Sequence, residues 1–362
     1  MKASDFIAAS LSRFGVDCVF YYPGAGLVEL ESAARRQGLD LVLMRVESSL
    51  PHAASGFFQA SGKIAACFAS SGPGALNMFT ALAAAKADGV PLIAFTANVS
   101  IRQRGKKGFQ DFDVASAAMP FVKRAFEVSR VDGLRAVIEE AFLACVSGKP
   151  GPVLIDIPRD LFDCEVTDVP ACIQRRVFKP RKFFAGGGIP VSFGVVVSGN
   201  GLHKYEFLDS VSGQFTLVSS DKFGCMGFSI PAAVGACVAG VGSVLLVCGD
   251  GDFQMAQQEL ATIAQYSLPV NILIVNNNSL GAVDVIKKAR GEGSIGFFVP
   301  CLRKLADSFG FTYSVTNSFS ISPCSGPSLI EMPSEVCESA GLEAVRRSLN
   351  ASRSAFVYPA SF

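Results

Sequence analysis

Residues 247–277 begin Val-Cys-Gly-Asp-Gly-Asp-Phe-Gln-Met and end on an Asn-Asn pair. A short apolar run, Ser243–Val247, leads into the glycine turn, and a second, Val270–Val275, leads into the amides. Between them Gln254–Tyr266 has helical spacing. The stretch therefore predicts a βαβ unit with two parallel strands.

The glycine turn and the amide pair offer oxygen ligands at one edge of that predicted sheet. Because the carboxyl ends of parallel strands share an edge, we expect Asp250 and Asn277 to lie close together. Carboxylate, amide and backbone oxygens suit Mg²⁺, which often bridges to phosphates. Gly249 and Gly251 would let backbone N–H groups approach a diphosphate. A Gly-Asp-Gly turn alone is usually structural, but the amide pair at this interval favours a metal–diphosphate site.

The composition excludes several classes of protein. Half of the 362 residues are hydrophobic and the net charge is +1, which gives no sign of a nucleic-acid partner or a polybasic membrane anchor. The apolar runs are too short to span a bilayer, and Met1–Asp5 lacks a signal-peptide core. Eleven Cys without regular spacing indicate reduced thiols and a cytoplasmic protein. With two His residues, a His-based metal site is not expected.

Strands and helices alternate in two series along the chain. The predicted strands are Cys18–Tyr22, Leu41–Arg45, Ala65–Ala69, Leu92–Thr96 and Val153–Ile157, then Val195–Val197, Thr216–Val218, Val244–Val247 and Ile272–Val275. The predicted helices include Ser4–Phe14, Ser49–Ala60, Ala75–Ala85, Val131–Ser147 and Pro231–Ala239. Such alternation predicts an α/β fold with two doubly wound parallel-sheet domains. We place them at 1–160 and 194–335, with a charged, glycine-containing linker at 161–193 and a tail at 336–362 that has one helix, Ala340–Leu349.

Further motifs occur in a fixed order along both halves. They are Tyr22–Gly26, Arg45–Glu47, His52–Phe57, Ser70–Asn77, Gly108–Asp111, Gly151–Pro158, Gly201–His203 and Gly224–Ala233. Together with the Gly-Asp-Gly to Asn unit, they resemble the acetolactate synthase-like large catalytic subunits among thiamine diphosphate (ThDP) enzymes. The resemblance covers about residues 1–160 and 194–335. It implies a pyrimidine-binding first domain and a diphosphate-binding second domain, without the family's middle domain.

The resemblance also implies where the cofactor and its metal bind. The Mg²⁺ ligands would be Asp250, Asn277 and the carbonyl of Ser279. The other implied cofactor-binding residues are Pro23, Gly24, Ala25, Glu47, Gly72 and Asn77 in the first domain, and Gly201, Leu202, His203, Met226, Gly249, Gly251, Asp252, Leu280 and Gly281 in the second.

Two residues are implied as catalytic. Glu47 would hydrogen-bond to the far ring nitrogen of the aminopyrimidine and so favour the imino form that takes the thiazolium proton. Taken alone, a Glu between a strand and a helix would be assigned as a helix cap. Gln110 would reach the substrate side of the site, although its position also fits a solvated loop amide. Met226 would hold the cofactor bent, and His203 would contact the diphosphate.

The implied reaction is decarboxylation of a pyruvate-like 2-oxo acid, followed by carboligation to a second carbonyl. Two alternatives stay open: a simple decarboxylase of the sulfopyruvate or phosphonopyruvate type, which releases an aldehyde, and a non-catalytic ThDP-binding subunit. The short middle and the missing aromatic-rich run after Asn277 depart from acetolactate synthases. FAD is not expected, because its domain is the missing one and no dinucleotide fingerprint is present.

The expected partners are a small-molecule 2-oxo acid and further copies of the chain. In this family the cofactor lies between two subunits, which implies a homodimer or homotetramer; nucleic acid and membrane are not expected. The basic loop Ser100–Gly108, with Arg102, Arg104, Lys106 and Lys107, would either bind an anionic substrate or be a solvated charged loop.

Overall fold

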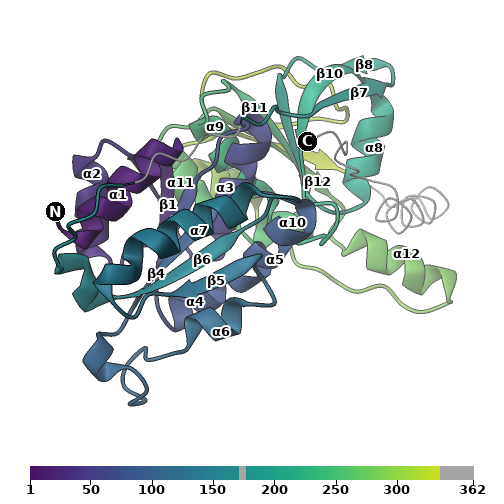
Figure 1. The fold of residues 1–362 in the computed structure, drawn as a ribbon. Helices are drawn as coiled ribbons and strands as arrows, with labels where there is room; N and C mark the ends of the chain where they lie inside the picture. The colour runs from purple at the N-terminus through teal and green to yellow at the C-terminus, as the bar shows by residue number, and fades with distance from the viewer. Residues whose placement is uncertain (171–176, 335–362) are drawn as a thin grey trace. The chain divides into compact units, whose positions relative to one another are not determined.

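The computed structural model describes residues 1–170 and 177–334, which form two compact units that divide between Lys179 and Pro180 (Figure 1). The tail helix expected over Ala340–Leu349 lies outside the described residues. Within those residues, no helix combines the length and the apolar character needed to cross a bilayer.

The first unit is built on a six-stranded sheet in the order β2-β1-β3-β4-β6-β5, with every neighbouring pair parallel. Its strands are β1 (Cys18–Tyr21), β2 (Asp40–Leu43), β3 (Ala66–Ser70), β4 (Ile93–Asn98), β5 (Arg124–Glu127) and β6 (Val153–Pro158). Its helices are α1 (Ala3–Phe14), α2 (Val28–Arg36), α3 (Ser49–Ser61), α4 (Pro73–Asn77), α5 (Phe79–Asp88), α6 (Val114–Ala118) and α7 (Leu134–Val146). Short 3₁₀ turns are η1 (Ile101–Gln103), η2 (Val131–Gly133) and η3 (Arg159–Asp163).

Burial explains why the central strands are mostly apolar. Every residue of β4 and β6 is buried, because helices pack on a parallel sheet from both sides. Helix α1 contacts both α2 and α7, and α3 packs on α5, so the helices form separate groups. The chain passes from β1 to β2 on one side and then to β3 on the other, which places a topological switch point between β1 and β3.

The second unit has the sheet order β13-β14-β12-β11-β9-β10-β7, and β8 pairs with β10. Its strands are β7 (Lys182–Gly186), β8 (Ile189–Pro190), β9 (Val195–Ser198), β10 (Val211–Val218), β11 (Val244–Gly249), β12 (Val270–Asn276), β13 (Thr312–Val315) and β14 (Ser328–Pro333). Its helices are α8 (Leu202–Ser210), α9 (Ser229–Val238), α10 (Asp250–Gln254), η4 (Gln257–Glu259), α11 (Leu260–Gln265), α12 (Gly281–Ala289) and α13 (Leu302–Phe309). All neighbouring strands are parallel except β7, which runs antiparallel to β10.

The fold class predicted from the sequence is confirmed, with differences in individual elements. Residues 182–190, which composition assigned to the linker, form β7 and β8 and extend the second sheet. Phe183 and Ala185 pack on the core while Phe184 stays exposed, an alternation that the surrounding charge conceals in the sequence. The helix expected over Gln254–Tyr266 is divided into the end of α10, a 3₁₀ turn and α11.

Candidate functional site

The second unit has its own switch point, between β9 and β11. The chain leaves β9 toward β10 on one side and returns to β11 on the other, so the turns after β9 and β11 open a crevice at the carboxyl edge. A cavity of about 130 Å³ lies there. All twelve residues implied for the diphosphate and metal end line it, namely Gly201, Leu202, His203, Met226, Gly249, Asp250, Gly251, Asp252, Asn277, Ser279, Leu280 and Gly281.

Asp250 brings a buried carboxylate to the lining of this cavity. It is buried, and its Oδ1 accepts a hydrogen bond from the N–H of Gly251 at 2.8 Å. Its Oδ2 is buried and has no hydrogen-bond partner among the described residues. Burial raises the pKa of Asp250, and the backbone N–H groups of Gly251 and of residues 277–279 oppose that rise. Since a buried unsatisfied oxygen is costly, the site fits a cation that would complete it.

Asn277 and Ser279 follow β12 in a turn beside Asp250. The side-chain oxygen of Asn277 accepts from the N–H of Ser279 at 3.0 Å, which fixes the turn. The Ser279 hydroxyl donates to Asp284 on α12, which ties the turn to that helix. The oxygen donors expected for Mg²⁺ therefore come from the ends of β11 and β12, which are neighbours in the sheet.

His203 is buried against three glycines at the same edge. A Cβ on Gly201 or Gly249 would come within 2.8 or 3.2 Å of its Nδ1, and one on Gly199 within 3.3 Å of its Nε2. Burial lowers the pKa of His203 to about 4, so the ring is neutral at pH 7. Its Nε2 is buried without a hydrogen-bond partner in the described ranges. A neutral imidazole can donate one hydrogen bond to a phosphate oxygen without adding charge.

Asp252 lines the same cavity as Asp250, but protein groups donate hydrogen bonds to both of its carboxylate oxygens. It is fully buried and accepts from the Gly227 N–H at 2.7 Å and from the Ser229 hydroxyl. Burial raises the pKa of Asp252 to about 6, and these donors oppose the rise. Asp252 thus ties α10 to the turn that carries Met226. Its hydrogen bonds therefore stabilise that turn.

In the first unit, Glu47 lies beside the turn that follows β3. Its Oε2 accepts from the Asn77 side-chain amide at 3.0 Å. A Cβ on Gly74 would lie 3.2 Å from its Oε1, so the helix start approaches the carboxylate closely. Gly24, in the Pro23–Ala25 turn after β1, faces Ser70: a Cβ on Gly24 would meet the serine hydroxyl. These residues gather at the switch point between β1 and β3.

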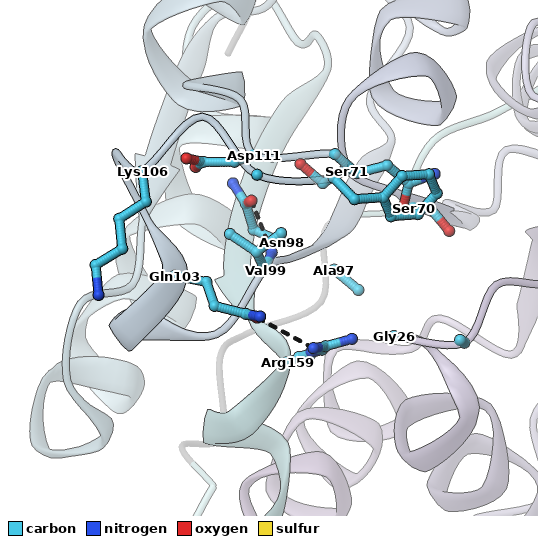
Figure 2. Close-up of a pocket in the computed structure, with 14 residues that line it drawn as sticks. Gly26, Ser70, Ser71, Ala97, Asn98, Val99, Gln103, Lys106, Asp111 and Arg159 are labelled. Carbon is cyan, nitrogen blue, oxygen red and sulfur yellow. Dashed lines mark hydrogen bonds between the residues drawn. The ribbon is translucent and has the colours of Figure 1, made fainter.

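A second cavity, of about 370 Å³, opens at the same carboxyl edge of the first unit (Figure 2). Gln110 lines it with a positive φ of 60°, and a Cβ on Gly72 would lie 3.4 Å from the Gln110 Cα. The other residues that line it are Ala25, Gly26, Ser70, Ser71, Ala97, Asn98, Val99, Gln103, Lys106, Gly108, Phe109, Asp111 and Arg159. Gln103 and Arg159 were not predicted from the sequence, since only the adjacency of β4 and β6 brings them together.

The four cations of the basic loop separate into different environments. Arg104 pairs with Glu127 and reaches the buried Asp156 at 3.5 Å, so it anchors the loop to the sheet. Lys106 lines the cavity, whereas Arg102 and Lys107 do not. The hypothesis of an anion-binding loop is therefore narrowed to Lys106.

Comparison with known proteins identifies the family to which these two edges belong. A model of the thiamine pyrophosphate enzyme N-terminal TPP-binding domain matches residues 1–117, and one of the C-terminal TPP-binding domain matches residues 200–323. The chain belongs to the thiamine pyrophosphate (ThDP) enzyme family. The first match includes the β1/β3 switch point and the second begins in the turn after β9, and the matches occur in the order that the sequence predicted.

The similar curated proteins are acetolactate synthases. The probable acetolactate synthase large subunit of Methanocaldococcus jannaschii is 35% identical over 185 residues, which are 50% of this chain and 31% of that protein. Acetolactate synthase 1 of Zea mays is 40% identical over 161 residues, 44% of this chain and 25% of that protein. Acetolactate synthase of Arthrospira platensis is 38% identical over 178 residues, 47% of this chain and 31% of that protein. Less than a third of each relative is matched.

Proposed function

We propose that this chain binds ThDP and Mg²⁺ and decarboxylates a pyruvate-like 2-oxo acid, with carboligation of the product to a second carbonyl. The observation that carries the proposal is the Oδ2 of Asp250 at the β9/β11 switch point, which is buried and has no hydrogen-bond partner among the described residues. Asp250, the Asn277 side chain and the Ser279 carbonyl would hold the metal. The glycine turns and the start of α8 at Leu202 would face the diphosphate with N–H groups.

In the first unit, Glu47 would hold the proton that activates the aminopyrimidine. Asn77 donates to one of its oxygens, which leaves the other oxygen, near Gly74, to face a ring nitrogen. Met226 and Leu280 would supply apolar surface under the cofactor beside Gly251. When bound, ThDP supplies the nucleophilic carbon and the electron sink. The protein's share is to position that carbon, exclude water and move protons.

The test of the metal site uses Asp250→Asn, which keeps the side chain's size but removes its charge. We expect the wild-type chain to gain thermal stability with ThDP plus Mg²⁺ and to release CO₂ from pyruvate. Asp250→Asn should lose at least about tenfold in apparent cofactor affinity, the usual cost of a lost charged contact. Unchanged Mg²⁺ dependence in the variant would reject the assigned ligand.

The test of catalysis uses Glu47→Gln. This variant should bind ThDP nearly as tightly as wild type, measured by the same thermal shift, but should lose turnover. Full CO₂ release from Glu47→Gln would reject its role. If the wild type binds ThDP and no 2-oxo acid is consumed, the chain is instead the non-catalytic subunit considered above.

Product analysis decides between carboligation and simple decarboxylation. Acetolactate synthase-like activity gives a hydroxyketone, whereas the sulfopyruvate or phosphonopyruvate type releases an aldehyde. The two-unit division of the chain is the observation that favours this second candidate, because that type shares the two-domain plan. A 2-oxo acid screen with carbonyl detection by mass spectrometry separates the two.

A further inference from the structure

The 370 Å³ cavity of the first unit is lined by Arg159, whose guanidinium is oriented by a hydrogen bond to a neighbouring side chain. Arg159 begins η3 after β6, and its Nη2 donates to the Gln103 Oε1 at 3.1 Å. Gln103 is itself positioned by the Ser100 hydroxyl, which donates to the same oxygen at 3.0 Å. Figure 2 shows Gln103 and Arg159 pointing toward each other along one side of the cavity. Arg159 is exposed, and the neutral Gln103 orients its guanidinium without balancing the charge.

The cavity's acidic side chain forms no ion pair with this guanidinium in the described structure. Asp111 is the carboxylate among the lining residues, and its two oxygens accept from the backbone N–H groups of Gly105 at 3.1 Å and Lys107 at 2.8 Å. Within the part of the chain that the structure describes, neither Arg159 nor Lys106 forms an ion pair. By contrast, Arg104, which lies on the same loop as Lys106, pairs with Glu127. Two unpaired cations in one cavity make it an attractive site for an anion.

The size and lining of the cavity fit part of a small molecule. Its volume lies within the roughly 300–1,000 Å³ typical of small-molecule sites. Besides the two cations it presents side-chain amides from Asn98, Gln103 and Gln110. A guanidinium has five N–H donors in a planar fork, and one donor to Gln103 leaves a face that matches a carboxylate, sulfonate or phosphonate.

We propose that this cavity binds an anionic oxygen group of the substrate other than the carboxylate lost as CO₂, and that Arg159 is the residue that recognises it. The inference rests on the proposed function, which makes the substrate a 2-oxo acid. A cation bound to the departing carboxylate would stabilise the ground state more than the transition state, in which that charge is being lost, and would slow decarboxylation. A second anionic group bears no such cost, so its recognition by Arg159 tightens binding without hindering the chemistry.

The first test measures binding without turnover. Malonate is titrated calorimetrically into wild type, Arg159→Gln, Lys106→Gln and Arg102→Gln, the last being a control on the same exposed loop outside the cavity. Arg159→Gln should weaken malonate binding by about 10- to 100-fold, the range for a hydrogen bond to a charged group. An ammonium lacks the planar fork of the guanidinium, so Lys106→Gln should weaken malonate binding by up to about fivefold. No binding to wild type, an unchanged affinity in Arg159→Gln, or an equal loss in Arg102→Gln would overturn the proposal.

The second test uses turnover and identifies the source of the anion. CO₂ release is compared for pyruvate, which has one carboxylate, and 2-oxoglutarate, which has two. If the anion is a distal group of the donor, Arg159→Gln raises KM for 2-oxoglutarate by about 10- to 100-fold and that for pyruvate by less than about threefold. If it is the carboxylate of the second 2-oxo acid, the same rise appears in the acceptor KM for carboligation.

These outcomes distinguish a failure of the anion site at Arg159 from a failure of the proposed function. In single-turnover CO₂ release, which needs no acceptor, an equal loss of apparent pyruvate affinity would overturn the assignment of Arg159 to a second anion. Failure of wild type to release CO₂ from any 2-oxo acid would reject the proposed function, and the malonate titration would then judge the anion site by itself. Arg159→Lys, which keeps the charge but loses the fork, should fall between wild type and Arg159→Gln.

Discussion

Gly251 stands between the cofactor cavity and the side chains that form its floor. A Cβ at this position would lie 2.9 Å from the Leu280 Cδ2 and 3.2 Å from the Met226 Cε, which are ends of flexible side chains. We expect Gly251→Ala to change the free energy of unfolding by less than about 1 kcal/mol, because these ends can move and alanine favours α10. The displaced tips would enter the cavity, so ThDP affinity should fall by about tenfold or more.

The control for this prediction is Gly62→Ala, which meets backbone instead of side-chain ends. Gly62 has a φ of +74°, and a Cβ there would lie 2.1 Å from the Phe178 carbonyl oxygen. This variant should lose about 2 kcal/mol or more of stability in urea unfolding and keep the ThDP affinity of its folded fraction. If Gly251→Ala were the less stable of the two, our account of the cavity floor would be wrong.

Asp156 makes the stability of the first unit depend on pH. It is buried on β6, accepts from Thr96 and Asn98 at 2.6 Å each, and burial raises its pKa from 3.8 to about 6. Between these values the folded state keeps a proton that the unfolded state has lost. Its stabilising contribution is therefore present below about pH 4 and is lost as the pH rises through 6, by roughly 3 kcal/mol at about 1.4 kcal/mol per pKa unit.

Asp156→Asn should remove this component. Its free energy of unfolding, measured in urea from pH 4 to 7, should rise relative to wild type by roughly 3 kcal/mol across that interval. The amide can donate to the Thr96 hydroxyl and still accept from Asn98, so the fold should be retained. Asp132→Asn, an exposed control in the same unit, should leave the profile unchanged. Parallel wild-type and Asp156→Asn profiles would contradict the prediction.

At the scale of elements, the sequence identified strands best where burial is complete. Residues 153–158 and 270–276 are mostly apolar because both faces of a parallel strand are covered, and the polar Asp156 and Asn271 within them are buried too. Strand β7 was not predicted, because Lys182 and exposed Phe184 alternate with packed residues inside a charged segment. The division of the helix after Asp250 was also not predicted, since apolar periodicity does not reveal a 3₁₀ turn within a helical stretch.

Helix α12 connects the candidate metal turn to the segment that follows it. Buried Asp284 accepts from the hydroxyls of Ser279 and Ser294 and from the Ile295 N–H at 2.8 Å, and these donors lower its pKa. Asp284→Asn should loosen both segments, because an amide cannot accept all three hydrogen bonds equally well. We expect about a tenfold weaker apparent Mg²⁺ affinity and faster proteolysis within residues 290–300.

The matched control for α12 is Ser294→Ala, which removes one donor and leaves the bond to Ser279. It should speed proteolysis of residues 290–300 but change Mg²⁺ affinity by less than about threefold. If both variants lost Mg²⁺ affinity equally, the bond between Asp284 and Ser279 would have no separate effect on the metal turn.

At the scale of the whole molecule, the order of the strands decided which parts of the site could be anticipated. Asp250 and Asn277 end consecutive strands of one βαβ unit, so local pattern was enough to bring them together. Gln103 and Arg159 meet because β4 lies beside β6, with β5 beyond it at the edge, an order that periodicity does not encode. Burial lowers the pKa of His203, and the glycines that pack around its ring come from the carboxyl ends of two strands, β9 and β11.

The two candidate edges lie in separate units, and we propose that a working site takes one edge from each of two chains in a homodimer or homotetramer. Mixing two inactive variants tests this. In a mixed dimer of Glu47→Gln and Asp250→Asn chains, one site would carry both changes and the other neither. Random reassociation makes half of the dimers mixed, so about a quarter of wild-type CO₂ release should return. If each site were built within one chain, every site would carry one of the changes and no activity would return. A control mixture of Glu47→Gln with Glu47→Gln,Asp250→Asn chains has no intact site in either arrangement and should stay inactive.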